Sequence, residues 1–486
     1  MIEEHVRIHD KFSIELKVGF TAQSNLRIND FSVNLWTFVP NSLDINRYSY
    51  SKEDFYRDVK SNVRLITPIY LLEDIANENK LPLRLLTLSF QNLANDPTES
   101  HISDYETHIK MFQSILKSSI RDEIDRILEC RSENEQTFLI TSYIRNISAI
   151  ASIYRNLSEI IQTPSVEKNI FNYYLFGDEF MSNLIELHTF KLLRGLKESR
   201  VSFYQNEKIK LTELIDNEIR YKKQKGFSVI EEDSKNNNRD TVNRLNALKK
   251  YMESQLFLNI KKREDGAFIR QIYYSLAAGI SMIFATIIAF SFQLKYGNFT
   301  LPLFIALVVS YMLKDRIKEL SRHYFSHKLG SKYFDNKTDI SFNNVPIGWY
   351  KESQSFVKEA QVPAEVIQLR NRSAILEAEN RINDEKIILY RLQVELDRKD
   401  IEKSNLYPVD GVNNIIRINL SEFIRKMDNP HVPLYIKDNE MDYKIIEGEK
   451  IYYLNFILRY QYLKQIELKR YRIIFNRDGI KELERF

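Results

Sequence analysis

A stretch without charge in the middle of the chain limits most strongly what this protein can fold into. Residues 271–313 contain one charged side chain, that of Lys295, where the chain average of 28% charged residues would give about twelve. Its first part, residues 272–292, would form a helix about 31 Å long, which matches the hydrocarbon core of a bilayer. Its second part, residues 299–313, would reach only about 22 Å and would need snorkelling side chains or a locally thinned membrane. The pattern favours a transmembrane helical hairpin over two buried helices of a soluble protein, and whether the second helix fully spans stays open.

Basic residues flank the uncharged stretch on both sides, and its turn contains Lys295 alone. They are Lys261, Lys262, Arg263 and Arg270 before it and Lys314, Arg316, Lys318, Arg322, Lys328 and Lys332 after it. Positive charge beside spanning helices remains on the cytoplasmic side, where it is attracted to anionic lipid headgroups. The charges therefore predict a multi-pass membrane protein with both termini in the cytoplasm and a lipid bilayer as its partner. Residues 1–10 are polar and lack the apolar core of a signal peptide, which agrees with this orientation.

Small residues recur four positions apart in the hairpin, a spacing that lets helix backbones approach closely in lipid. The pairs are Ser275 and Gly279, Ala285 and Ala289, and Ala306 and Ser310. Packing within one hairpin is the favoured interpretation, and a homo-oligomer of several hairpins stays open. No Asp, Glu, Arg or His lies inside either predicted helix, which argues against a proton relay.

The residues before the hairpin change from strand patterns to helical ones near residue 50. Residues 12–20 and 31–39 alternate apolar and polar side chains, as half-buried strands do. Three pairs have the spacing of a helix N-terminal cap or capping box: Ser51 with Asp54, Ser103 with Glu106, and Ser132 with Glu135. Helical spacing continues over residues 138–161 and then over residues 166–221, with Gly177 or Gly195 as a break.

The residues after the hairpin begin with a basic helix and then return to strand patterns. Apolar residues alternate in residues 388–396, 416–420 and 452–460, and the last of these follows the turn signal Glu447-Gly448. A further strand, RYRIIFN, is followed by the turn signal Asp478-Gly479. These patterns predict an antiparallel, sandwich-like domain at the C-terminal end of the chain.

The predicted fold class is an α+β membrane protein with five consecutive parts. They are N-terminal strands (1–50), a helical cytoplasmic module (51–270), the transmembrane hairpin (271–313), a juxtamembrane helical and linker region (314–384), and a β-rich cytoplasmic module (385–486).

Composition excludes several classes of function. The chain of 486 residues has 70 Lys and Arg against 66 Asp and Glu, a net charge of +4, which does not fit a basic nucleic-acid coat. Its many aromatic residues follow core periodicities and are not interleaved with a basic stripe, so nucleic acid is not a predicted partner. A single cysteine, Cys130, excludes intramolecular disulfides and Cys-rich zinc sites.

The sequence contains no motif that identifies a reaction. His323 and His327 lie one helical turn apart, but a catalytic zinc needs about three protein ligands. His5 and His9 have the same spacing in a predicted strand, which separates them by about 13 Å. The segment KLGSK at Lys328 lacks the spacing of a phosphate-binding loop, no GxSxG occurs, and Cys130 has no identifiable base. The prediction is therefore no catalytic, cofactor-binding or metal-binding residue and no cofactor.

Two segments of the sequence resemble segments of known proteins. Residues 34–59 (NLWTFVPNSLDINRYSYSKEDFYRDV) and 470–484 (RYRIIFNRDGIKELE) are similar to a group of bacterial membrane proteins with a central two-helix hairpin and no assigned activity. The similarity extends over most of the chain and carries no catalytic motif. It implies a location in a bacterial inner membrane.

Three functional hypotheses follow from the sequence. The leading one is a non-enzymatic, membrane-anchored cytoplasmic scaffold or signalling protein whose protein partner the sequence does not identify. The second is an enzyme of an unrecognised class with a site between its cytoplasmic modules. The third is a homo-oligomeric pore built from several hairpins.

Overall fold

The chain has an α+β fold with antiparallel sheets. The computed structural model describes residues 1–164, 166–198, 205–232, 234–298, 300–330, 333–373, 375, 377–378, 380, 384–439 and 442–486. Two compact units are formed from segments that alternate along the chain. We call residues 1–63, 258–404 and 411–486 the sheet unit, and residues 64–257 and 405–410 the helical unit.

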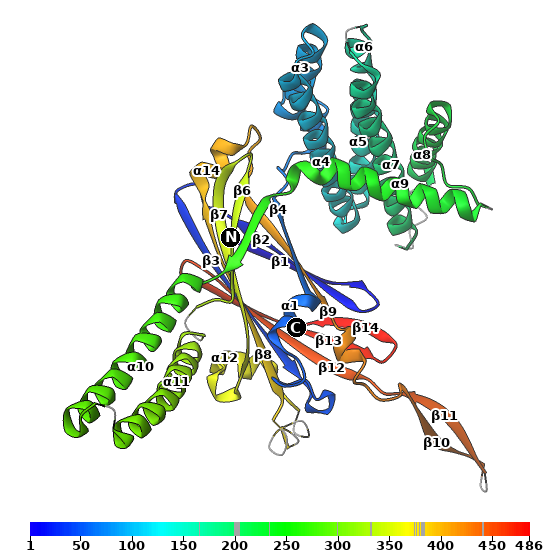
Figure 1. Ribbon diagram of the computed structural model, residues 1–486. Helices are drawn as coiled ribbons and strands as arrows, with labels where there is room; N and C mark the ends of the chain where they lie inside the picture. The colour runs from blue at the N-terminus through cyan, green and yellow to red at the C-terminus, as the bar shows by residue number, and fades with distance from the viewer. Residues whose placement is uncertain are drawn as a thin grey trace. The chain divides into compact units, whose positions relative to one another are not determined.

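The largest element of the sheet unit is an eight-stranded sheet whose neighbouring strands are all antiparallel (Figure 1). In spatial order its strands are β14 (Gly479–Arg485), β13 (Gln465–Asn476), β12 (Tyr452–Tyr462), β3 (Ile28–Val39), β8 (Lys386–Asp397), β7 (Val345–Val357), β6 (Asn336–Phe342) and β5 (Asn259–Glu264). The N-terminal strand β3 thus lies in the middle of the sheet, with strands from the C-terminal part of the chain on both sides.

The predicted alternation of β3 and β8 is confirmed by their pairing. Phe31 lies opposite Val394 and Val33 opposite Leu392, and all four side chains are no more than 3% exposed. Opposite residues of an antiparallel pair point to the same face, so the apolar positions of both strands enter one core.

A four-stranded sheet packs on the long sheet within the same unit. Its order is β1 (Ile2–Asp10), β2 (Ser13–Thr21), β9 (Gly411–Asn419) and β4 (Val59–Leu65). The ring of Phe20 on β2 lies 5.3 Å from that of Phe31 on β3, which in turn stacks on Tyr462 of β12 at 4.5 Å. The contact between Phe20 and Phe31 joins the two sheets, and the stacking of Phe31 on Tyr462 lies within the long sheet.

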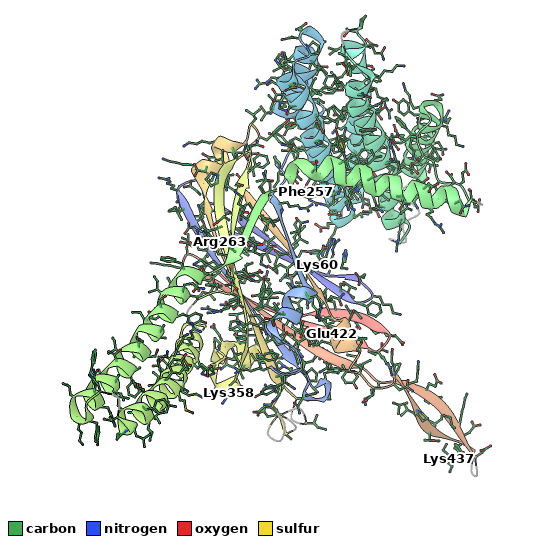
Figure 2. All side chains as sticks on the ribbon, viewed as in Figure 1. Lys60, Phe257, Arg263, Lys358, Glu422 and Lys437 are labelled. Atoms are coloured by element: carbon green, nitrogen blue, oxygen red, sulfur yellow. The ribbon has the colours of Figure 1, made fainter. Side chains whose placement is uncertain are left out.

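Short elements connect the strands of the sheet unit. They are η1 (Asn41–Leu43), α1 (Lys52–Asp58), η4 (Glu359–Gln361), α12 (Ala364–Arg370), α14 (Arg398–Ser404) and α15 (Ser421–Ile424). The strands β10 (His431–Asn439) and β11 (Asp442–Glu449) pair only with each other and form the exposed ribbon that carries Lys437 in Figure 2. Glu447-Gly448 therefore lies within a strand, and its prediction as a turn is wrong.

The helical unit is a bundle with long helices. Its elements are α2 (Leu72–Ile75), α3 (Leu81–Asn95), α4 (Glu99–Glu129), α5 (Glu133–Asn156), α6 (Ser158–Ile161), α7 (Lys168–Glu198), α8 (Gln205–Lys225), α9 (Lys235–Glu253) and η3 (Ser254–Leu256). Gly177 and Gly195 do not break α7. A Cβ at Gly177 would lie 2.1 Å from Tyr154 Oη, and one at Gly195 would lie 2.5 Å from Leu128 Cδ2. Both glycines therefore allow neighbouring side chains to approach the helix closely.

The predicted helix starts have different outcomes. Ser51 and Asp54 form a complete capping box at α1, as predicted. Ser132 is the N-cap residue of α5 but makes no side-chain cap hydrogen bond. The start predicted at Ser103 is wrong, because α4 begins a turn earlier, where the Thr98 hydroxyl accepts a hydrogen bond from the His101 amide at 3.4 Å.

The five consecutive parts expected from the sequence do not correspond to the compact units. Strands from the 1–50 and 385–486 segments share the same sheets. The 51–270 segment contributes β4 and β5 to those sheets, and the 314–384 segment, expected to be helix and linker, contains β6 and β7. The pattern within one strand indicates its buried face but not its partner strand, and this is why the sequence separated segments that pair in space.

Candidate functional site

The uncharged stretch forms a helical hairpin that leaves the long sheet after β5 and returns to it before β6 (Figure 1). Its helices are α10 (Ala267–Tyr296) and α11 (Leu301–Gly330), each of 30 residues and therefore about 45 Å long. Gly297 follows α10 with a φ of 76°, a conformation that favours glycine. Helix α11 continues through residue 313 without a break, so the hairpin and the juxtamembrane helix expected from the sequence are one element.

The two helices contact each other through small side chains. The Ser310 hydroxyl donates a hydrogen bond to the Ala285 carbonyl across the hairpin at 3.3 Å. Four small residues of the two helices are buried, with exposed fractions of 0–8%: Ala277, Ser281, Ala306 and Ser310. Small residues let helix backbones come close together, so the pair Ala306 and Ser310 packs within the hairpin.

The predicted small-residue pair Ser275 and Gly279 lies outside the contact between the two helices. Ser275 and Gly279 are exposed, and a Cβ built on Gly279 would have no neighbour within 4 Å. This face of α10 is not used by the packing of the hairpin.

Many large apolar side chains of the hairpin lie outside the helix contact and are exposed. They are 44–65% exposed at positions such as Ile272, Leu276, Ile287, Phe290, Phe304 and Leu307. Among the described residues, α10 is the one helix with the length and composition needed to cross a membrane. Helix α11 does not meet that criterion, so two full spans remain a proposal.

Polar contacts fasten the base of the hairpin to the sheet. The Asp265 amide donates to the Asp335 carbonyl at 3.2 Å, and the Phe334 amide donates to Asp265 Oδ2 at 3.3 Å. Lys351 Nζ on β7 lies 3.2 Å from Asp265 Oδ1. The residues that enter and leave the hairpin are thus bonded to each other and to the sheet.

Two carboxylates, those of Asp335 and Glu352, bind further residues of the sheet unit near the base of the hairpin. Asp335 accepts hydrogen bonds from Lys52 at 2.6 Å, from the Tyr56 hydroxyl at 2.9 Å and from the Gln354 amide at 2.8 Å. Glu352, 2% exposed, accepts from Lys262 at 2.7 Å and from the Tyr390 hydroxyl at 2.9 Å. Burial raises the pKa of both tyrosines, which keeps them protonated as donors. Lys262, which the sequence placed at the lipid surface, is therefore paired with a buried carboxylate.

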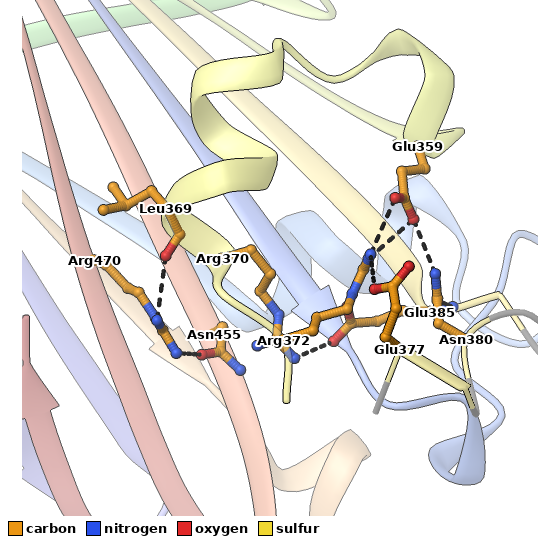
Figure 3. A network of polar contacts seen from close by, with 9 residues as sticks. All are labelled: Glu359, Leu369, Arg370, Arg372, Glu377, Asn380, Glu385, Asn455 and Arg470. Atoms are coloured by element: carbon orange, nitrogen blue, oxygen red, sulfur yellow. Dashed lines mark hydrogen bonds and ion pairs between the residues drawn. The ribbon is translucent and has the colours of Figure 1, made fainter. Parts of the chain in front are cut away.

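A second polar network lies at the end of α12 and includes Arg370, Arg372 and Arg470 (Figure 3). Arg372 donates to both carboxylate oxygens of Glu359 at 3.0 Å and to Glu385 at 3.1 Å. Arg370 donates to Glu385 at 2.9 Å. The hydrogen bonds of Arg372 lower the pKa of Glu359. Arg470 donates to the Leu369 carbonyl at 3.2 Å and to Asn455 at 3.3 Å.

A cleft of about 230 Å³ opens beside this network and is lined by Arg370, Arg372 and Glu385 together with Tyr452 and Tyr453. Arginines in a cleft suit an anionic ligand, but here both are already paired with glutamates. We therefore interpret the network as a clamp that holds the end of α12 and Arg372 beside the sheet.

The helical unit contains a buried charged cluster that the sequence reasoning missed. Arg155 on α5 lies 3.3 Å from Asp178 on α7 and 2.7 Å from Glu218 on α8, and its guanidinium stacks on the Tyr221 ring at 3.6 Å. Asp178 is fully buried, and this burial raises the pKa of its carboxyl. Ser182 donates to Glu218 at 2.6 Å.

A signal for this cluster was present in the sequence. Asp178, Ser182 and Glu186 are spaced four apart on α7, so they form a polar stripe on one helical face. Glu186 is paired with Lys222 of α8, and the stripe therefore joins neighbouring helices of the bundle.

The residues considered from the sequence do not come together as a site. His5 and His9 lie on β1, and His9 Nδ1 is 3.5 Å from Glu15. His323 lies on α11, whereas the side chain of His327 lies outside the described residues. Cys130 ends α4, and its thiol donates to the Ser132 carbonyl at 3.6 Å. Within the described parts of the chain, no group of three or more His, Cys, Asp or Glu side chains could hold a metal ion.

Comparison of the chain with protein-family models, with curated proteins and with solved structures gives no match.

Proposed function

We propose that this protein is a membrane-anchored scaffold or signalling protein, held at a bacterial inner membrane by the α10–α11 hairpin. The observation that supports the proposal is the arrangement of side chains in the hairpin. Small residues fill the helix contact, while large apolar side chains such as Ile283, Ile287 and Phe304 are 60–65% exposed. Soluble monomers rarely expose contiguous apolar patches beyond a few hundred Å², and in lipid these side chains would meet an apolar solvent.

The transfer free energy of these exposed side chains favours lipid over water. Burying one large apolar side chain contributes about 1.5–3 kcal/mol, and the hairpin exposes many of them on both helices. The helical unit and the part of the sheet unit outside the hairpin make up the rest of the chain, and in this proposal both remain in the cytoplasm. The described residues supply no identifiable catalytic arrangement, so binding or scaffolding is the preferred role.

The first experiment measures membrane attachment. We expect the full-length protein to stay in the membrane pellet after alkaline carbonate washing. The double variant Ile283→Lys with Ile287→Lys should be released. The matched control, Leu88→Lys with Ile209→Lys, changes residues that are 44% and 55% exposed in the helical unit and should stay in the pellet. A wild-type protein that is soluble without detergent would contradict the proposal.

The second experiment measures topology and assembly. Reporter fusions at the C-terminus should indicate the cytoplasm, and fusions in the turn at residues 297–300 should indicate the opposite side. A C-terminal reporter on the far side would contradict the orientation. Native mass spectrometry of the detergent-solubilised protein tests the pore hypothesis, because a ring of several copies would favour a pore over an anchor.

A further inference from the structure

The contacts within the hairpin define which residues of α10 and α11 lie at the same depth. Ser310 bonds to the Ala285 carbonyl at 3.3 Å, and the Arg322 guanidinium lies 5.4 Å from the Tyr274 ring. These two contacts, about three turns apart on each helix, agree on one antiparallel register. Each step toward the end of α11 is therefore matched by one step back along α10.

This register places charges beside the first part of the apolar run of α10. The charged residues of α11 after Leu313 lie alongside α10 residues 274–281, and they are Lys314, Asp315, Arg316, Lys318, Glu319 and Arg322. Their heads point outward: the side chains of Arg316 and Glu319 are 78% and 69% exposed. Any lipid that surrounds α10 at this level would also touch these charges.

We use the term apolar belt for the depth over which both helices carry no charged side chain. In this register the apolar belt is short. It is limited by α11, whose uncharged part from Leu301 to Leu313 is about 20 Å long. A typical bilayer core is about 30 Å thick. The first part of the 21-residue apolar run of α10 thus lies beside charged residues of α11. The whole length of that run therefore cannot serve as the membrane-spanning part of the hairpin.

Aromatic and basic pairs mark both ends of this short belt. At one end Lys314 Nζ lies 4.0 Å from the Tyr311 ring, and at the other Lys295 Nζ lies 5.3 Å from the Tyr296 ring. Tyrosine and lysine are favoured at the boundary between hydrocarbon and water. The alternative near boundary, at Tyr274 and Arg322, would give a belt of about 33 Å but would place five charged side chains of α11 in hydrocarbon, where they are strongly disfavoured.

We infer that the hairpin is fitted to a hydrocarbon layer only about 20 Å thick, so its lipid partner is a thin or locally thinned bilayer. The near headgroups lie at Lys314 and the far headgroups at Lys295. This inference rests on the proposed membrane anchoring and specifies its depth.

The test compares two positions on one face of α10, about three turns apart. Leu276 and Ile287 are similarly exposed, at 52% and 60%. In a Cys130→Ser background, Leu276→Cys and Ile287→Cys are placed one at a time in the full-length protein. The protein is reconstituted in phosphatidylcholine vesicles with 18-carbon chains and treated with a membrane-impermeant maleimide. Cys130 of the wild-type protein serves as the reference outside the hairpin.

We expect labelling at position 276 to be at least tenfold faster than at position 287, with both rates normalised to the detergent-solubilised, unfolded protein. Equal protection of both positions would overturn the short belt while leaving membrane anchoring intact. Labelling of both positions, together with failure of the protein to float with vesicles, would overturn the anchoring and with it the inference.

A second arm varies the bilayer and the belt. Incorporation into vesicles with 14-carbon chains should exceed that with 22-carbon chains several-fold. The variant Lys314→Leu, Asp315→Leu, Arg316→Leu, Lys318→Leu and Glu319→Leu lengthens the belt and should remove this preference and protect position 276. A wild-type preference for the thicker vesicles would overturn the inference.

Discussion

The α10–α11 hairpin and the helices of the helical unit have opposite arrangements of side chains. In α4 the inward positions are large, and Phe112, Leu116 and Ile120 are at most 1% exposed. In the hairpin the inward positions are small, as at Ala277 and Ser310, and the large apolar residues point out. Packing of the bundle buries its large apolar side chains. Packing of the hairpin leaves its large apolar side chains exposed on the outer faces of the two helices.

The two regions also differ in whether charged side chains are buried. The helical unit pairs the partly exposed Arg155 with the buried carboxylates of Asp178 and Glu218, and this pairing offsets the desolvation cost of the two carboxylates. No charged side chain is buried among the described residues of α10 and α11. Specific internal contacts stabilise the bundle, whereas in the proposed membrane setting the lipid around the hairpin stabilises its exposed apolar side chains.

The largest effect is expected from breaking the buried cluster. Arg155→Met leaves Asp178 and Glu218 without their guanidinium and should destabilise the helical unit by about 3–5 kcal/mol. Urea unfolding of the full-length protein in nanodiscs, followed by far-UV circular dichroism, measures this change. The control Arg121→Met removes a pair in which the arginine side chain is 53% exposed and should change stability by less than about 0.5 kcal/mol. Equal losses in both variants would contradict the role assigned to the cluster.

A pair of leucines tests the opposite arrangement directly. Leu116→Ala in α4 removes a fully buried side chain and should cost about 2–5 kcal/mol. Leu276→Ala in α10, at a position 52% exposed, should change the unfolding free energy in nanodiscs by less than about 0.5 kcal/mol. If the two substitutions were equally costly, Leu276 would be buried and the comparison would fail.

The pH dependence of the helical unit should reflect His188. Burial, with help from Lys191, Lys117 and Arg121, lowers its pKa to about 4, below the ordinary value near 6.5. Between these values the unfolded chain binds more protons, so the unfolding free energy should fall by about 3 kcal/mol as the pH falls from 6.5 to 4. In His188→Gln this part of the slope should disappear. An unchanged slope in urea unfolding at stepped pH would show that other groups cause it.

The smallest effect is expected at the helix contact of the hairpin. Ala277→Leu inserts a large side chain at a position that is fully buried and should cost about 1–3 kcal/mol. The control Gly279→Ala adds a methyl group where no neighbour lies within 4 Å and should stabilise the helix by about 0.5–1 kcal/mol. Thermal unfolding in nanodiscs measures both. Destabilisation by Gly279→Ala would indicate a contact with another copy at this face.

Local patterns predicted many elements of the sheet unit. The alternation over residues 388–396 and 452–460 corresponds to β8 and β12, and the segment RYRIIFN lies in β13. Strand β7 was missed because its buried residues include Glu352, Ser353 and Gln354, which do not follow an apolar alternation. Their burial depends on partners such as Lys262 and Tyr390, which lie far away in the sequence.

The hairpin was located from its missing charge, but its depth was not. The run of 21 apolar residues in α10 predicts a full span only if α10 is taken without its partner helix. Only the register of Ser310 against Ala285 shows that charges of α11 lie beside the first part of that run.

The sequence by itself determined where β8, β12 and the helical hairpin form, because apolar periodicity and missing charge are local properties that a single segment carries. The tertiary structure decided that β3 lies between β8 and β12, that α10 and α11 share one register, and that Arg155 meets Asp178 and Glu218. Each of these depends on the free energy of contacts between residues distant along the chain, and the pattern of either partner alone does not specify the other.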